Sequence, residues 1–341
     1  MKGWTVQGKS GFDSLQFNEE APVPTCGDSE VLVRFHAASL NYRDLIIPKG
    51  MYPFAQRDGV VPGSDGAGTV EDIGSKVHRF QKGDRVATLF NQGHLAGSLT
   101  PKISETGVGG VVDGTITQYG VFSEEGLVEV PSSLNWLQAS TLSCAALTAW
   151  NALYGLKKLM PGETVLTQGT GGVSIFAAQF ALAAGARVIA TTSSDSKAQT
   201  LKDLGVQHVI NYKTDPNWGE TAKSLTPDKL GVQHIIEVGG ANTMAQSLKA
   251  IAIDGIISII GFLGGRSKEQ PGFTDCLSHI CTVRGVLVGS RLQFAEMNRA
   301  IEANNIKPVI DKTVFRLEQL EEAYQYMWDQ KHFGKLCINI E

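Results

Sequence analysis

The sequence lacks the features that mark secreted, membrane-bound or nucleic-acid-binding proteins. Its net charge is only −4 and no cluster of Lys and Arg forms a basic stripe, which disfavours nucleic acid and acidic membranes as partners. The longest apolar run, around residues 175–184, is too short to span a bilayer, and the first residues contain no apolar signal-peptide core. We therefore expect a soluble, cytoplasmic protein.

Cysteine is scarce and follows no metal-binding pattern. The five cysteines are an odd number without a CxxC pair, which favours reduced thiols in a cytosolic protein over disulfides. One group, Cys276, His279 and Cys281 beside Asp275, deserves weighing as a metal site. Its spacing does not match known ligand sets, so inward-packed thiols in a loop or helix are the favoured interpretation.

A glycine cluster is the strongest signal in the sequence. The apolar run 164–168 leads into Gly169 and Gly171, and Ser174 stands where a GxGxxG fingerprint has its third glycine. The pattern alone also fits an ordinary glycine turn before a buried helix. However, an Ala-rich segment (175–185) and a second apolar run (187–191) complete a β-α-β unit, which predicts a nucleotide site on the free N–H groups of the helix.

The rest of the chain divides into a β-rich part and an alternating part, and 341 residues with 42% apolar content suffice for two domains. Residues 1–130 read as strands, with a long Gly-, Ser- and Thr-rich loop at 91–117. The apolar strands after residue 164 predict a parallel sheet. The further predicted elements are helices at 136–156, 197–204, 243–253, 294–304 and 317–328, and strands at 207–212, 233–238, 255–261 and 335–340.

Several motifs occur in the order typical of one enzyme family. They are Asn41-Tyr-Arg-Asp44, the glycine-rich 62–68, Lys82-Gly-Asp-Arg-Val86, 142–150, 169–174, Val209-Ile-Asn-Tyr212 and Phe333-Gly-Lys335. The chain thereby resembles the medium-chain dehydrogenase/reductase superfamily, in its zinc-independent quinone-oxidoreductase-like or zinc-type alcohol dehydrogenase-like branch. The resemblance implies an α/β fold with a GroES-like catalytic domain (1–145 and 289–341), a Rossmann domain (146–288) and an active site in the cleft between them.

The sequence departs from the zinc-dependent relatives at their metal ligands. By the resemblance, Asn41 and Ser64 occupy the first two ligand positions, and Cys144 alone survives at the third. Residues 87–118, which would hold a structural zinc, contain no cysteine. Since catalytic zinc needs about three protein ligands, we predict that the protein binds no zinc and that Cys144 is a small core residue.

The end of the second nucleotide-binding strand bears on the choice of cofactor. No carboxylate stands at Thr192, where NAD-selective domains place one for the ribose. Ser193, Ser194 and Lys197 offer donors for a 2′-phosphate, and the resemblance adds Tyr212, so we predict NADPH rather than NADH. Either serine also suits a helix cap, and Asp195 would repel a phosphate if it pointed inward. The full set expected to bind the cofactor is Thr148, Gly169, Thr170, Gly171, Gly172, Val173, Thr192, Ser193, Ser194, Lys197, Tyr212, Gly239, Gly261, Phe262, Leu263, Phe333 and Lys335.

Without a metal, negative charge on a substrate oxygen needs hydrogen-bond donors. The candidates by position are Asn41, Tyr42, Arg43, Tyr52 and Ser64. Tyr52 is either a proton donor or a space-filling aromatic, and Arg43 either serves the site or pairs with an aspartate (44 or 65).

The sequence therefore predicts an NADPH-dependent, metal-free reductase of α,β-unsaturated carbonyl compounds or quinones. Two alternatives remain open: a zinc-free alcohol dehydrogenase or aldehyde and ketone reductase, and a catalytically silent NADPH-binding sensor. The apolar segment 283–289 resembles the sheet edge through which relatives pair, so we also expect a homodimer.

Overall fold

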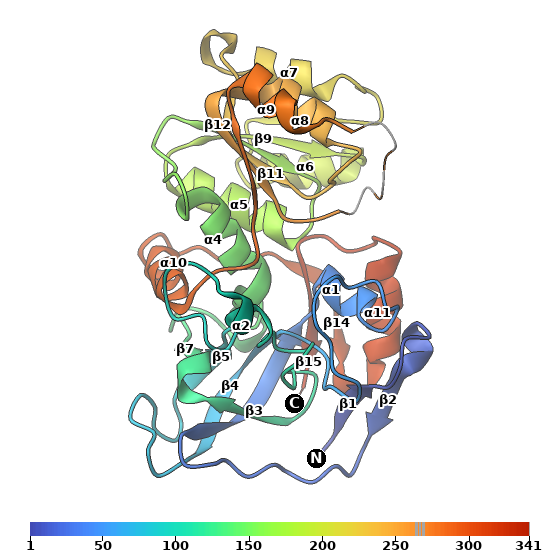
Figure 1. The fold of residues 1–341 in the computed structure, drawn as a ribbon, viewed down its shortest axis with the longest axis vertical. Coiled ribbons are helices and arrows are strands. Elements are labelled where there is room, and N and C mark those ends of the chain that lie inside the picture. The colour runs from blue at the N-terminus through green and yellow to red at the C-terminus, as the bar shows by residue number, and fades with distance from the viewer. Residues whose placement is uncertain (263–264, 266, 268–269, 341) are drawn as a thin grey trace. The chain divides into compact units, whose positions relative to one another are not determined.

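The computed structural model describes residues 1–262, 265, 267 and 270–340, and the chain divides into two compact units (Figure 1). Unit 1 consists of Met1–Leu147 together with Gly289–Glu341, and unit 2 is the continuous segment Thr148–Val288. Unit 1 is thus assembled from both ends of the sequence, which Figure 1 colours blue and red.

A seven-stranded sheet forms the frame of unit 1. Its longest strand, β3 (Glu30–Ser39), pairs antiparallel with β4 (Asp65–Ile73) along one edge, and with β6 (Tyr119–Ser123) and β15 (Lys335–Asn339) along the other. The remaining strands are β14 (Ile310–Arg316), β5 (Arg85–Thr88) and β7 (Leu127–Glu129), and β1 (Gly3–Val6) pairs with β2 (Leu15–Asn18) in a separate ribbon.

Unit 1 also contains three short helices, and two longer ones come from the C-terminal segment. They are α1 (Tyr42–Ile46), α2 (Pro101–Ser104), α3 (Trp136–Ala139), α10 (Arg291–Ala303) and α11 (Leu320–Trp328). Strand β3 buries Val31, Val33 and Phe35 in the main core of the unit, as the alternating pattern of a half-buried strand requires. The predicted loop 91–117 contains one helix, α2, and no strand.

Unit 2 is a doubly wound, six-stranded parallel sheet. Its strands are β8 (Thr164–Gln168), β9 (Arg187–Thr192), β10 (His208–Asn211), β11 (Val232–Glu237), β12 (Ile251–Ile259) and β13 (Thr282–Gly285). Its helices are α4 (Leu147–Tyr154, whose first residue belongs to unit 1), α5 (Gly172–Ala183), α6 (Asp195–Asp203), α7 (Trp218–Ser224), α8 (Met244–Ala250) and α9 (Phe273–His279).

The strand order places a ligand-binding edge. In the order β10-β9-β8-β11-β12-β13 the direction of winding reverses between β8 and β11. Ligands of open α/β sheets bind at the carboxyl ends of the strands beside such a reversal. The fold class predicted from the sequence is confirmed. Within the described residues, no helix is both long and apolar enough to cross a membrane.

Two predicted helices differ from the structure. The segment 136–156 is interrupted by a π-helical turn, Leu142–Ala146, which follows Ser140 and Thr141; the hydroxyls of both bond back to carbonyls three residues earlier. The helix predicted at 243–253 ends at Ala250, because the next residues pair with β11 as part of β12. An apolar stretch such as 251–253 fits either structure until its partner is known.

Candidate functional site

The glycine loop of unit 2 has the geometry of an anion-binding turn. Gly169 has a φ of +72°, and a Cβ added at Gly169 or Gly171 would meet nothing within 4 Å. Gly171 is the N-cap of α5 and has no side chain to cap the helix, so the first-turn N–H groups remain available to a ligand. Buried Ser174, at the third fingerprint position, donates from its hydroxyl to the carbonyl of Gln168 at 2.6 Å and ties the helix to β8.

A buried carboxylate, Glu237, organises the neighbouring edge of the sheet. It ends β11, is 0% exposed and accepts five hydrogen bonds. Two come from the backbone N–H groups of Gly239 and Gly240, at 3.0 and 2.9 Å. The side chains of Gln168, Thr243 and Ser247 donate the other three. The backbone of the predicted cofactor residue Gly239 is therefore held in place by a hydrogen bond to the Glu237 carboxylate.

The predicted phosphate-selecting residues gather at the ends of β9 and β10. Thr192, the last residue of β9, lies opposite Asn211, and the N–H of Tyr212 donates to its carbonyl at 3.0 Å. Ser194 caps α6 by accepting from the N–H of Lys197 at 3.4 Å. The carboxylate of Asp195 accepts from the side chain of Asn211 at 2.8 Å.

The remaining predicted cofactor residues fall into three groups. Thr148, Thr170, Gly172, Val173, Ser193, Gly261 and Phe262 belong to unit 2, and the Phe262 ring is 46% exposed. Leu263 lies outside the described residues. Phe333 and Lys335 belong to unit 1, where the N–H of Phe333 donates to Asp311.

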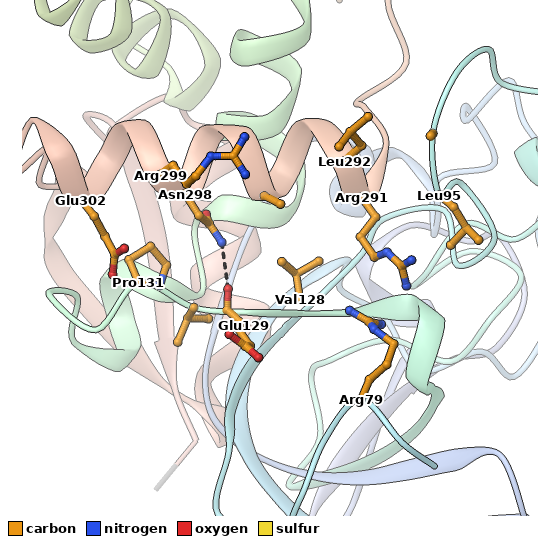
Figure 2. Close-up of a pocket in the computed structure, with 13 residues that line it drawn as sticks. Arg79, Leu95, Val128, Glu129, Pro131, Arg291, Leu292, Asn298, Arg299 and Glu302 are labelled. Atoms are coloured by element: carbon orange, nitrogen blue, oxygen red, sulfur yellow. Dashed lines mark hydrogen bonds between the residues drawn. The ribbon is translucent and has the colours of Figure 1, made fainter. Parts of the chain in front are cut away.

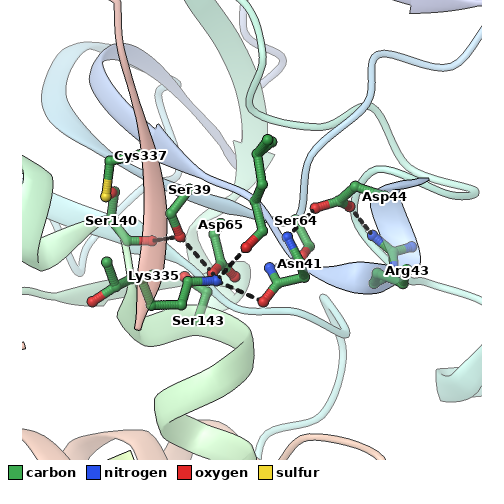
Figure 3. Close-up of polar contacts among 12 residues, drawn as sticks. Ser39, Asn41, Arg43, Asp44, Ser64, Asp65, Ser140, Ser143, Lys335 and Cys337 are labelled. Carbon is green, nitrogen blue, oxygen red and sulfur yellow. Dashed lines mark hydrogen bonds and ion pairs between the residues drawn. The ribbon is translucent and has the colours of Figure 1, made fainter. Parts of the chain in front are cut away.

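A second polar cluster lies inside unit 1, and Figure 3 shows its members converging on the Lys335 ammonium group. Lys335 is 2% exposed, and its Nζ donates to the Leu40 carbonyl (2.7 Å), Asn41 Oδ1 (2.7 Å) and Asp65 Oδ2 (3.0 Å). Ser39 also donates to Asp65 Oδ2, at 2.8 Å. An ammonium group has three N–H donors, so none is left for the cofactor contact expected of Lys335.

The turn between β3 and α1 sets the position of Asn41. Its backbone N–H donates to the carboxylate of Asp44 at 2.8 Å, and its Nδ2 donates to the Ser64 hydroxyl at 3.3 Å. Burial raises the pKa of the Asp44 carboxyl to about 6, although Arg43 lowers it. Predicted residues Asn41 and Ser64 are therefore in contact, and Lys335 touches the same amide.

Arg43 is a buried cation with several partners. Its guanidinium stacks 4.9 Å from the Tyr52 ring and 4.8 Å from the Phe90 ring, pairs with Asp44 at 3.2 Å and donates to a backbone carbonyl. Of the two aspartates considered as its partner, Asp44 is the one it contacts. The Tyr52 hydroxyl accepts from Arg43 Nε at 3.3 Å, and no described residue accepts its proton. Tyr42 stacks on Trp328 with ring centres 6.3 Å apart, which gives its ring a packing role.

A separate groove in unit 1 runs between α10 and the residues around β7, with a volume of about 630 Å³ (Figure 2). Arg79, Glu129, Arg291 and Arg299 line it, and none of the predicted site residues does. Arg291 is already paired with Glu125, and Asn298 bonds the Glu129 carbonyl. Apolar side chains, among them Leu95, Val128 and Leu292, line much of the rest of the groove. Because the groove contains none of the predicted site residues, we assign it no part in the reaction.

Known proteins resemble the chain along nearly its whole length. Two family models match, the alcohol dehydrogenase GroES-like domain over residues 27–132 and the zinc-binding dehydrogenase over residues 172–303. A zinc-type alcohol dehydrogenase-like protein of Schizosaccharomyces pombe is 46% identical over 338 residues, which cover 97% of each chain. The chain belongs to the medium-chain dehydrogenase/reductase superfamily.

Two further members of the superfamily share less sequence with this chain. The quinone oxidoreductase of Mus musculus is 28% identical over 323 residues, covering 92% of this chain and 90% of its own. The crystal structure of a Sinorhizobium meliloti 1021 protein named after alcohol dehydrogenase superposes with a TM-score of 0.91 at 37% identity, covering 99% and 98% of the two chains. The protein is thus an oxidoreductase of a superfamily that binds NAD(P)H, and its glycine loop fits such a dinucleotide.

The residues of unit 1 do not fit the catalytic zinc that some members of the superfamily carry. The predicted ligand positions hold an amide, a hydroxyl and the thiol of Cys144, and burial raises the pKa of that thiol to about 12. Only the thiol is a ligand type that zinc prefers, and a catalytic zinc site needs about three protein ligands. Among the described residues, no group of three His, Cys, Asp or Glu side chains is placed to hold a metal ion.

Sequence reasoning overlooked the two carboxylates on which these clusters depend. Glu237 follows the apolar Ile235-Ile236 and stands two residues before Gly239-Gly240, and a charge at such an apolar strand end signals a buried, fully bonded group. Asp65 was considered only as a partner of Arg43. Its contact with Lys335 joins residues 270 positions apart, which no local pattern reveals.

Proposed function

We propose that the protein is an NADPH-dependent reductase of α,β-unsaturated carbonyl compounds or quinones that works without a zinc ion. The observation that carries the proposal concerns the residues of unit 1 that stand where zinc-dependent relatives hold their metal ion. There, Asn41 and Ser64 are joined to each other, and the amide is held by the ammonium group of Lys335. The position thus offers hydrogen-bond donors in place of a Lewis acid.

The chemistry follows from the donors that the chain supplies. The bound dinucleotide supplies the hydride for the conjugated carbon, and the Tyr52 hydroxyl or water supplies the proton that completes the reduction. The amide N–H of Asn41 and the hydroxyl of Tyr52 would stabilise the negative charge that develops on the substrate oxygen. Tyr52 is held by Arg43, which fixes the hydroxyl without consuming its proton. Because Asn41 cannot take up a proton, this set suits reduction of a conjugated carbonyl better than oxidation of an alcohol.

The preference for NADPH rests on the end of β9. That strand ends in a threonine instead of an acidic residue, and Asp195 is bonded to Asn211. Lys197→Ala should weaken NADPH binding about tenfold and leave NADH binding unchanged, since one charged contact to the 2′-phosphate is lost. Lys202→Ala, on the same helix, is the matched control. Equal effects on both cofactors, measured by nucleotide fluorescence, would contradict the assignment.

The reaction itself is tested with chelator-treated protein, NADPH and a small enone. We expect the saturated ketone as the product, identified by mass spectrometry. An allylic alcohol would point to carbonyl reduction. Tight NADPH binding without turnover of either an enone or a quinone would favour a sensor.

We further propose that the protein is a homodimer paired through β13. This strand is the last of its sheet and is shorter than predicted, ending at Gly285. Directly before it in the chain, α9 exposes Phe273 (98%) and Leu277 (78%), which are four residues apart and so share one helix face. Leu277→Glu should give a monomer in sedimentation velocity, while Leu230→Glu, at an exposed position elsewhere in unit 2, should not. A wild-type monomer at micromolar concentration would refute the proposal.

A further inference from the structure

Lys335 is a charged side chain in an unusual place, because it is 2% exposed in the interior of unit 1. Buried lysines are rare unless they are paired and hydrogen-bonded. Here only one of the three acceptors, Asp65, is charged, and the other two are the Leu40 carbonyl and the Asn41 amide oxygen. The positive charge is therefore shared with neutral oxygens instead of being confined to an ion pair.

This arrangement decides the orientation of the Asn41 amide. Because the ammonium group donates to Oδ1, the opposite atom must be the NH₂ group, with two N–H donors. One of them bonds the Ser64 hydroxyl at 3.3 Å. The second has no acceptor within the described part of the chain. A cation 2.7 Å from the amide oxygen also polarises the amide and makes that second N–H a stronger donor.

We propose that Lys335 is a positioning residue that performs, through Asn41, part of the work of a metal cation. Its charge aligns the amide and strengthens the N–H that binds the substrate oxygen. This inference rests on the proposed reductase function and adds a specificity. The oxygen must be an acceptor, as in a ketone, thioester or quinone, because the amide fixed in this way offers no acceptor to an alcohol proton.

Asp65 would serve as the counter-ion. It accepts from Lys335 and Ser39 through Oδ2, whereas its buried Oδ1 has no partner among the described residues. Lys335→Met alone would leave this carboxylate buried and unpaired, which would destabilise the fold whatever the role of Lys335 in the reaction. Lys335→Met combined with Asp65→Asn removes both charges together. Lys335→Gln with Asp65→Asn does the same and retains two N–H donors.

The paired variants separate a positioning role from a structural one. If the ion pair has a structural role only, both paired variants should turn over like the wild type, whatever the change in their melting temperature. We expect them to melt like the wild type while kcat/KM for an enone falls about 100-fold, mainly in kcat, as for loss of an oxyanion donor. The NADPH affinity of the paired variants should stay within about twofold of the wild type, because all three N–H groups of Lys335 donate to oxygens of the protein itself.

Coupling to Asn41 is tested in a double-mutant cycle. Asn41→Leu should lower kcat/KM by a similar factor, and adding the paired substitutions to it should cost little more, since both act on one interaction. Additive losses would show that Lys335 acts by another route and would overturn the inference. Wild-type kcat/KM in either paired variant would also overturn it.

A readout without turnover separates this inference from the proposed function. In protein labelled with ¹⁵N-asparagine, the side-chain signal of Asn41 is the one missing from Asn41→Leu. We expect the paired variants to shift it strongly, because the ammonium group bonded to the amide oxygen is gone. An unmoved signal would refute the contact between Lys335 and Asn41, whereas a wild type that reduces neither enone nor quinone would refute only the proposed function.

Discussion

Replacing Glu237 by Gln tests whether the carboxylate beneath the nucleotide-binding edge holds that edge in place. The substitution keeps the shape of the side chain but exchanges one acceptor oxygen for an NH₂ group. Oε1 accepts from Gly239, Gly240 and Thr243, and Oε2 accepts from Gln168 and Ser247. Every neighbour is thus a donor, and a glutamine must point its own N–H groups at one of the two sets.

A glutamine at position 237 should adopt the orientation that loses fewer hydrogen bonds, and this loss sets the change in stability. With the NH₂ group on the Oε2 side, the Ser247 hydroxyl can turn to accept, but the bond from Gln168 at 2.7 Å is lost. A bond to a buried charge contributes about 1.5–3 kcal/mol, and the three remaining bonds weaken because the charge is gone. The lower desolvation cost of a neutral amide offsets part of this. We therefore expect the free energy of unfolding to fall by about 2–3 kcal/mol.

Urea denaturation measures this loss, and NADPH fluorescence measures its consequence for the Gly239-Gly240 turn. Glu220→Gln is the matched control, because Glu220 forms an exposed pair with Lys249 in the same unit. Such surface pairs contribute at most about 1 kcal/mol, so the control should unfold almost like the wild type. If Glu237→Gln loses no more stability than the control, the charge of the Glu237 carboxylate does not strengthen its five hydrogen bonds as we assume.

Three further predictions concern the loop, the titration of a buried acid and the metal. Gly171→Ala should weaken NADPH binding at least about tenfold and leave the melting temperature unchanged, because its Cβ enters open space that the pyrophosphate would fill. The control Gly272→Ala should change neither the NADPH affinity nor the melting temperature. Since the pKa of Asp44 is raised to about 6, its proton stabilises the fold as the pH falls from 6 towards 4. Unfolding at pH 7 and pH 4 should show the wild type gaining about 2 kcal/mol relative to Asp44→Asn, and a constant difference would contradict the raised pKa. Chelator dialysis should change neither melting temperature nor turnover, and stoichiometric zinc in the purified protein by mass spectrometry would contradict the proposed metal-free site.

The nucleotide-binding unit was predictable because its signals are local. Gly169, Gly171 and the Ala-rich helix follow one another directly, and each residue type is required by the backbone at its own position. The end of α8 was not predictable in the same way. Ile251 begins a strand only because β11 lies beside it, and pairing with a distant strand is invisible in a short apolar run.

The residue types of the candidate site in unit 1 were predictable, but the hydrogen bonds and the ion pair that join them were not. Asn41 and Ser64 stood out because they replace metal ligands. Lys335, in the sequence Phe-Gly-Lys-Leu, was predicted only as a cofactor-binding residue. Its burial depends on β15 lying against β3, which brings its ammonium group to the Asn41 amide and the Asp65 carboxylate. This contact depends on which strands pair in the sheet, and the spacing of apolar residues along the sequence does not reveal that pairing.

The pairing of β15 with β3 also determines when this protein can become active during its synthesis. Unit 2 is one continuous segment, so it can fold as soon as it has left the ribosome. Unit 1 must wait for residues 335–339, because its sheet lacks an inner strand and its cluster lacks a cation until they arrive. A nascent chain that stops short of residue 335 would thus be able to hold the nucleotide while remaining unable to use it.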